Sequence, residues 1–221
     1  MGTSARERIL ARIRNAYEAR NLDPVKIAAE AAALLPPDGI IQPSFENLTN
    51  QQKFVERLIS ERLTATVDYI DEWDGMVAAV HRYCTGQGIP LRLAVPDHDC
   101  FTGRAWGEIS IHHDIALDER AVLECADYGI AETGTLVFTS RPDNPTLFHY
   151  LGLHHIVLIE SKAVLRYMED YWRLVRKNGN KHPRNINFIT GTSGTADIEA
   201  QNIRGAHGPR FLHVIIVGGA A

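Results

Sequence analysis

Apolar residues in the first quarter of the chain recur every three or four positions, which is the spacing of an amphipathic helix. Ile9, Ile13 and Tyr17 follow this spacing, and charged residues occupy the positions between them. Proline pairs and capping residues mark where such helices begin and end. The pattern predicts helices over residues 4–20, 25–35 and 50–63. We therefore expect residues 1–64 to form an N-terminal helical arm.

From residue 65 the pattern changes to short apolar runs of strand length that alternate with helical segments. The run 213–217 is continuous and rich in β-branched residues, as in a strand buried on both faces. The pattern predicts strands over 65–70, 90–95, 109–111, 122–126, 135–139, 153–160, 186–189 and 213–217, and helices over 74–84 and 161–177. Strands that alternate with helices indicate an α/β domain with a largely parallel sheet, here over residues 65–221.

Composition narrows the class of protein. A hydrophobic content of 45% with 23% charged residues is typical of a globular chain. The net charge of −4 argues against a nucleic-acid surface, and no apolar run reaches the roughly 18 residues of a membrane span. The three cysteines are widely spaced, so they exclude an iron–sulfur ligand set of the chain's own and favour a reducing compartment. We expect a cytoplasmic protein.

Residues 186–219 read as strand, glycine-bearing loop, helix, second glycine-bearing loop and buried strand, which is a β-α-β unit. Thr195 is the expected N-cap of the helix, with Asp197 and Glu199 in its first turn. Free N–H groups and the hydroxyls of Ser193 and Thr195 can bind a phosphate or carboxylate there. No lysine follows the second glycine as in a Walker loop, so two simple tight turns remain the alternative.

Two further positions in glycine-bearing loops suggest chemistry. His207 lies between glycines, where packing does not explain an imidazole. Glu132 lies in the segment GIAETGT, where a carboxylate can act as nucleophile or general base, or bind a polar ligand. A solvated glutamate on a bulged hairpin is the alternative. The predicted catalytic residues are Glu132 and His207, and the predicted ligand-binding residues are Gly129, Thr133, Gly134, Thr135, Ser193, Thr195, Asp197, Glu199, Gly205 and Gly208.

Other constellations carry less weight. The pairs His112-His113 and His154-His155 and the cluster Asp97-His98-Asp99 contain metal-ligating side chains. Adjacent residues of a strand point to opposite faces, however, and neither H-x-x-x-H nor H-E-x-x-H occurs. We therefore expect no metal site. The absence of G-x-S-x-G and G-x-G-x-x-G argues against a serine hydrolase and a standard dinucleotide site.

Four segments in fixed order carry a family resemblance: GIAETGT at 129–135, TADIE at 195–199, GAHGP at 205–209 and LHVIIVGG at 212–219. Together they resemble the signature of the LUD domain family, in particular its short members without ferredoxin-type cysteines. The resemblance runs from about residue 67 to the C-terminus and is strongest over 125–219. Family members usually have G-P-S-x-T where this chain has Gly191-Thr192-Ser193-Gly194-Thr195. Loss of that proline keeps the hydroxyls but makes the loop less rigid.

The resemblance implies a NagB/RpiA/CoA transferase-like fold, a three-layer α/β sandwich. It also implies a role in bacterial oxidation of L-lactate to pyruvate beside two iron–sulfur partner proteins. The chain would then be a non-redox accessory subunit that binds no cofactor itself, with the iron–sulfur clusters on its partners and a small carboxylate or phosphate as its ligand.

A second function class stays open at this point. Fold-level analogy suggests a stand-alone enzyme of the CoA-transferase or formyltetrahydrofolate-ligase kind, with Glu132 as acyl acceptor. A stable complex with iron–sulfur proteins would favour the accessory subunit, whereas CoA-dependent exchange that is lost in Glu132→Gln would favour the enzyme. We expect the 129–135 and 191–209 loops to meet at the edge where the parallel strands end, because open α/β sheets bind ligands there.

Overall fold

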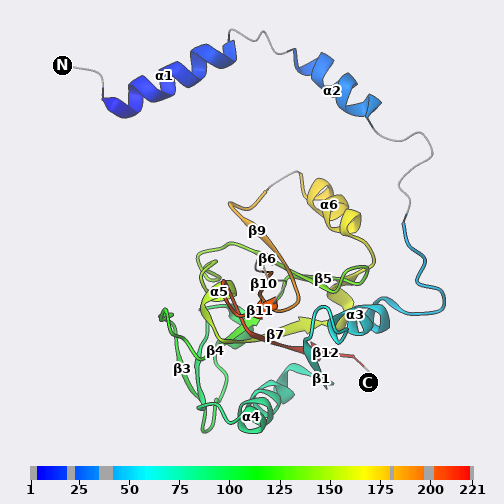
Figure 1. Cartoon of the computed structure of the whole chain (residues 1–221), viewed down its shortest axis with the longest axis vertical. Coiled ribbons are helices and arrows are strands. Elements are labelled where there is room, and N and C mark those ends of the chain that lie inside the picture. Colours follow the sequence, from blue (N-terminus) through cyan, green and yellow to red (C-terminus); the bar gives the residue numbers. More distant parts are fainter. Residues whose placement is uncertain (1–3, 19–22, 35–41, 180–181, 197–201, 220–221) are drawn as a thin grey trace. The chain divides into compact units, whose positions relative to one another are not determined.

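The structure, a computed structural model, describes residues 4–18, 23–34, 42–179, 182–196 and 202–219 (Figure 1). Contacts within the chain divide it into two units, Met1–Pro43 and Ser44–Ala221. In the described part of the chain, no helix is both long and apolar enough to cross a membrane.

The first unit contains two helices, α1 (Ala5–Glu18) and α2 (Pro24–Ala33), close to the predicted positions. The carboxylate of Asp23 accepts a hydrogen bond from the amide of Val25 at 2.9 Å and so caps α2. Apolar side chains remain exposed on both helices, with 48% of the surface of Ile13 and 76% of that of Val25 accessible. The described residues of this unit therefore form little core of their own.

The second unit begins before α3 (Asn50–Leu58). Thr49 and Gln52 form a reciprocal capping box at its N-terminus, with side-chain to main-chain distances of 3.2 and 2.9 Å. Phe54 and Leu58 have no accessible surface. The predicted arm over residues 1–64 differs from this division, because the apolar face of α3 is packed into the core of the second unit.

A six-stranded parallel sheet, the main sheet, forms the centre of the second unit, in the order β1-β12-β7-β4-β2-β3. Its strands are β1 (Thr66–Ile70), β2 (Arg92–Ala94), β3 (Ser110–His112), β4 (Ala121–Cys125), β7 (His154–Glu160) and β12 (Phe211–Val217). The central strands β7 and β12 pair over seven residues each and are buried along almost their whole length. This burial explains why their apolar runs are continuous.

A smaller sheet in the order β8-β5-β6-β9 covers one face of the main sheet. Its strands are β5 (Tyr128–Ile130), β6 (Thr135–Thr139), β8 (Val164–Leu165) and β9 (Ile186–Thr190). Leu136 and Phe138 of β6 pack with Val157 of β7 and Val214 of β12, so that the two sheets share a core.

Helices complete the layers. The helix α4 (Met76–Gln87) packs on the other face of the main sheet, and α6 (Met168–Lys177) packs on the smaller sheet (Figure 1). A short helix, α5 (Phe148–Leu151), precedes β7, and three 3₁₀ turns are η1 (Trp73–Gly75), η2 (Asp99–Phe101) and η3 (Ser161–Ala163). The predicted α/β fold with a mostly parallel central sheet is confirmed.

Two predicted helices differ from the structure. The segment 161–177 begins with η3 and β8, and α6 starts only at Met168. The helix predicted after Thr195 is contradicted by an antiparallel pair, β10 (Gly194–Ala196) and β11 (Asn202–Arg204), in which Thr195 faces Ile203. Both are β-branched residues that favour strands, so Thr195 lies in a strand and is not an N-cap. The predicted ligand-binding residues Asp197 and Glu199 lie outside the described residues.

A buried histidine on β12 gives the first testable prediction. His213 is 6% exposed, its Nδ1 lies 2.8 Å from the Thr66 hydroxyl, and its ring stacks on Tyr83 at 4.1 Å. Burial lowers the pKa of His213 to about 4. Because the folded-state pKa lies below the unfolded one, the neutral ring stabilises the fold above pH ~6.5, and this stability is lost as the pH falls toward 4.

We therefore expect the free energy of unfolding, measured in urea, to fall between pH 7 and pH 4.5 in the wild type. The fall should be about 2–3 kcal/mol larger than in His213→Gln. The comparison of pH slopes cancels the fixed cost of the substitution. His81→Gln, at a half-buried position of α4 whose side chain is 41% exposed, serves as the control and should keep the wild-type slope. Equal slopes in the wild type and His213→Gln would contradict the prediction.

Candidate functional site

The order of strands in the main sheet marks one place along its edge as the candidate site. The connection that leaves β2 leads to β3 at one side, whereas the connection that leaves β4 leads to β7 at the other side. The neighbouring parallel strands β2 and β4 therefore flank a topological switch point. Open α/β sheets bind ligands outside the carboxyl ends of the strands at such a point. We call this side of the main sheet the carboxyl edge.

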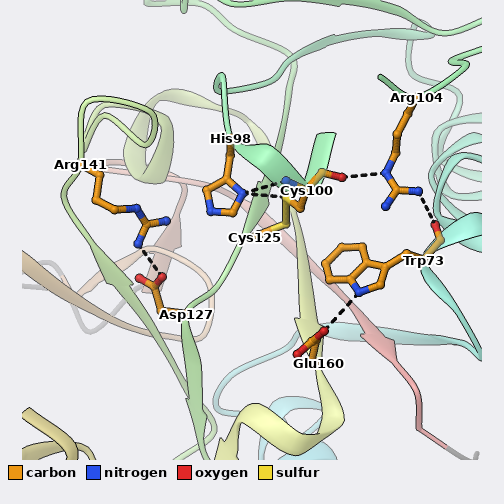
Figure 2. Close-up of a disulfide and its surroundings, with 8 residues drawn as sticks. All are labelled: Trp73, His98, Cys100, Arg104, Cys125, Asp127, Arg141 and Glu160. Atoms are coloured by element: carbon orange, nitrogen blue, oxygen red, sulfur yellow. Dashed lines mark hydrogen bonds and ion pairs between the residues drawn. A yellow bond between two sulfur atoms is a disulfide. The ribbon is translucent and has the colours of Figure 1, made fainter. Parts of the chain in front are cut away.

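Sulfur and imidazole groups meet at the switch point. Cys100 lies in η2 shortly after β2, and Cys125 is the last residue of β4. Their sulfurs form a disulfide, and the Nδ1 atom of His98 lies 2.9 Å from the sulfur of Cys100 (Figure 2). The sequence drew attention to His98, but a separation of 25 residues gave no sign that the cysteines are neighbours.

An arginine–carboxylate pair lies on one side of these sulfurs (Figure 2). Asp127 follows β4, and its Oδ2 accepts hydrogen bonds from the amide and the hydroxyl of Thr139 at 2.6 and 2.8 Å. Its Oδ1 accepts a hydrogen bond from Nη1 of Arg141 at 2.7 Å, and Asp143 lies 3.3 Å from Nε of the same guanidinium. Burial alone would lower the pKa of Arg141, but these carboxylates raise it, so the charge is permanent and fixed in place.

Arg141 borders two hollows. One, of about 470 Å³, is lined also by Tyr128, Tyr171 and His182. The other, of about 560 Å³, brings Arg141 together with Arg184. Guanidinium groups are suited to bidentate binding of carboxylates and phosphates.

A third hollow, of about 420 Å³, lies where β1, β7 and β12 end and is lined by Trp73 and Glu160. The indole N–H of Trp73 donates to Glu160 at 3.2 Å. A hydrogen bond from Lys162 lowers the pKa of Glu160. Arg104 links this hollow to the switch point, because it donates to the main-chain carbonyls of Trp73 and Cys100 at 3.2 and 2.7 Å (Figure 2).

The predicted segment 129–135 runs from the carboxyl side of the main sheet to its opposite edge, where its turn lies. It spans β5 and the turn to β6, and Nε of Arg57 donates to the carbonyl of Glu132 at 3.0 Å. Gly134 has φ +69°, and a Cβ there would lie 2.8 Å from Leu63, which shortly precedes β1. The turn therefore packs on residues near the amino end of β1.

Hydroxyl contacts join this turn to the predicted serine- and threonine-bearing loop. Thr135 lies 2.7 Å from both Thr133 and Thr190. The amide of Thr192 donates a hydrogen bond to the main-chain carbonyl of Leu63 at 3.1 Å, and the amide of Ser193 donates to the carbonyl of Pro209 at 2.9 Å. The structure thus brings the 129–135 and 191–209 segments to the same side of the main sheet.

This side is the edge where the parallel strands begin, which we call the amino edge. The prediction that the two loops meet at the carboxyl edge was wrong. The physical reason is the direction of β5, which leaves the carboxyl end of β4 and runs back toward the start of β1. Gly129 has a packing role, because a Cβ there would lie 2.9 Å from Ile159 and 3.0 Å from Phe54.

His207 is exposed and lines a hollow of about 580 Å³ at the amino ends of β4 and β7. Glu119, Arg120 and Tyr150 line the same hollow, as do the predicted residues Gly205 and Gly208. Glu132 is half-buried and is not among the residues that line it. Shared use of Glu132 and His207 by one ligand stays a prediction.

A buried carboxylate between two histidines was not anticipated. Glu124, in the middle of β4, lies 2.8 Å from Nδ1 of His149 and 2.7 Å from Nε2 of His155. The side chains of all three residues are completely buried. The neighbouring His154 instead contacts the hydroxyl of Tyr83 at 3.0 Å, which confirms that the two histidines of this pair face opposite sides of the strand.

Burial would raise the pKa of Glu124, but hydrogen bonds from His149 and His155 outweigh it and lower the pKa. The Glu124–His149–His155 group lies inside the protein, and Tyr150, which lines the hollow of about 580 Å³, packs against His149 with ring centroids 6.1 Å apart. The first role of the group is in the stability of the core.

Comparison with known proteins agrees with this fold. The LUD domain family model matches residues 110–217. A crystal structure of a DUF162 family protein from Deinococcus radiodurans superposes with a TM-score of 0.57 at 20% identity, over 77% of this chain and 99% of that chain. At this identity the likeness shows the fold alone.

Curated relatives are named lactate utilization protein C. The protein of that name from Bacillus pumilus is 35% identical over 127 residues, which cover 54% of this chain and 52% of the relative. The protein of that name from Geobacillus kaustophilus is 32% identical over 107 residues, 47% of this chain and 45% of the relative. The match thus spans about half the length of these relatives. The family model and these relatives together make residues 110–217 of the chain similar to the LUD domain family.

Proposed function

We propose that this chain is a non-redox accessory component of a system that oxidises L-lactate to pyruvate, with the iron–sulfur clusters on partner proteins. The observation that carries the proposal is the LUD domain over residues 110–217, together with its likeness to proteins named lactate utilization protein C. The part of the chain that matches contains the carboxyl ends of β4, β7 and β12 and the Asp127–Arg141 pair.

The geometry favours a small carboxylate as the ligand. Among the described residues, those that line the hollow of about 560 Å³ include Arg141 and Arg184 and no carboxylate, with Ser140, Thr146 and Asn185 as further polar neighbours. Asp127 and Asp143 hold the guanidinium of Arg141 in position. A carboxylate of the size of lactate or pyruvate would find two guanidinium groups in this hollow.

The test is complementation of a deletion strain that grows on L-lactate. Deletion should abolish growth on lactate and spare growth on pyruvate, and the wild-type gene should restore it. Arg184→Gln and Arg141→Gln should each reduce lactate-dependent dye reduction in extracts about ten- to a hundredfold, because a charge-assisted hydrogen bond is lost. Arg184 is exposed, so its replacement should leave folding intact.

Arg176→Gln, an exposed cation in the last turn of α6, is the matched control and should behave as the wild type. If lactate growth survives the deletion, the proposed role is wrong. If the deletion abolishes growth but Arg141→Gln and Arg184→Gln match Arg176→Gln, only the placement of the ligand is wrong. CoA-dependent exchange that disappears in Glu132→Gln would instead support a stand-alone transferase.

A further inference from the structure

The strongest unassigned feature is the set of His98, Cys100 and Cys125, which we call the HCC cluster. One ligand atom from each residue, Nδ1 or Nε2 of the imidazole and the two sulfurs, lies within 4.8 Å of the others. Cys125 is 8% exposed, and His98 and Cys100 are half-buried. His98 and Cys100 lie before residue 110, outside the match to the LUD domain, whereas Cys125 lies inside it.

His98 and Cys100 place two metal-ligating atoms side by side. The main-chain amide of Cys100 donates to Nδ1 of His98 at 3.2 Å, so this nitrogen presents a lone pair. The sulfur of Cys100 lies only 2.9 Å from the same nitrogen, and in a disulfide it carries no hydrogen. After reduction of the disulfide, the same two atoms are close enough to share a proton or to bind one metal ion.

Neighbouring residues hold the HCC cluster in place on both sides of the disulfide. Cys125 is fixed by the pairing of β4 with β7, where it lies beside Leu158. The segment that bears His98 and Cys100 is fixed by Arg104, which donates to the carbonyl of Cys100 at 2.7 Å and stacks over Trp73 at 5.7 Å (Figure 2). Three converging ligands on a rigid support, at the switch point of the sheet, have the arrangement of a metal site with an open position.

We propose that the reduced HCC cluster binds a thiolate-preferring divalent metal, of which Zn²⁺ is the type. A dithiol reductant supplies two electrons and two protons to the Cys100–Cys125 disulfide and is itself oxidised to a disulfide. Zn²⁺ then displaces the two thiol protons and takes two thiolates and the imidazole as ligands. A fourth position remains for water or another oxygen ligand. This proposal does not rest on the lactate role.

The test uses the full chain, stripped with a chelator, kept in a phosphine reductant and titrated with Co²⁺ as a spectroscopic probe. The wild type should bind one equivalent and show the ligand-field bands of tetrahedral Co²⁺ with a thiolate-to-cobalt charge-transfer band. Zn²⁺ should displace Co²⁺ and erase both. Cys100→Ser, Cys125→Ser and His98→Ala should each weaken binding at least about tenfold.

Cys84→Ala is the matched control, because Cys84 is a buried free cysteine on α4 that is not one of the three ligands, and it should bind Co²⁺ as the wild type does. Circular dichroism of each variant checks that it folds. Three results would each overturn the proposal: a reduced wild type without the bands, bands that persist in Cys125→Ser, or a disulfide that the phosphine does not open. Equal weakening in Cys84→Ala would also overturn it, because the metal would then bind elsewhere.

Discussion

Glu124→Ala is expected to lower the free energy of unfolding of the second unit by about 3–5 kcal/mol, because it removes the shared partner of two buried histidines. His149 and His155 both contact the Glu124 carboxylate, at 2.8 and 2.7 Å, and neither side chain reaches solvent. Phe138 packs against both imidazole rings, with centroids 4.6 and 5.7 Å away, and encloses them. Removal of the carboxylate would leave two buried N–H donors without an acceptor, as well as a cavity.

The measurement is urea unfolding at pH 7, with two controls. Glu124→Gln keeps the shape, and an imidazole can change tautomer to pair with the amide, so it should cost clearly less than alanine. Glu56→Ala removes an exposed carboxylate that pairs with Lys53, and it should change stability by less than about 1 kcal/mol. An alanine variant at position 124 as stable as Glu56→Ala would show that the buried group contributes nothing.

The same group sets the expected sign of the response to acid. The pKa of Glu124 is lowered in the folded state, so its ionised form stabilises the fold above the unfolded-state pKa of about 4.3. That stability is lost as the pH falls through the folded value. The acid-induced loss should therefore be smaller in Glu124→Gln than in the wild type.

Phe54→Ala is expected to cost about 3–5 kcal/mol, the usual range for a fully buried aromatic side chain. Phe54 has no accessible surface and packs in the core between the two sheets, where its ring would meet a side chain added at Gly129. Thermal or urea unfolding measures the loss. This result would show that α3 is part of the second unit and not of the N-terminal helical arm.

Ile13→Ala is the comparison within the arm, since Ile13 is 48% exposed on α1. A surface substitution of this kind should stay within about 0.5 kcal/mol. Equal and small effects at both positions would contradict the division of the chain after Pro43.

Periodicity predicted the type of most elements because burial imposes it locally. The strand predicted over 135–139 is β6, and the strand predicted over 213–217 forms the last five residues of β12. Pairing is not local, so the pattern did not reveal that β6 belongs to a second sheet. The helix expected after Thr195 failed for a different reason: a strand of three residues is too short to show a period.

The candidate site was harder to predict than the fold. The pairs Cys100 and Cys125, Asp127 and Arg141, and Glu124 and His149 join different elements of the fold. Whether the two residues of each pair come into contact depends on the order of the strands in the sheet, and the pattern of apolar residues does not reveal that order. The glycine-bearing loops were recognised as neighbours, and their segments do lie together, but the direction of β5 places them at the amino edge.

The most direct measurement is a pull-down of the tagged full chain from lactate-grown cells, assayed for co-purified iron–sulfur proteins and for lactate-dependent dye reduction. The proposed function predicts that both are recovered with the wild type, and that dye reduction is lost while the partners are retained with Arg184→Gln. Recovery of the chain alone, from cells whose growth on lactate does not require it, would contradict the account.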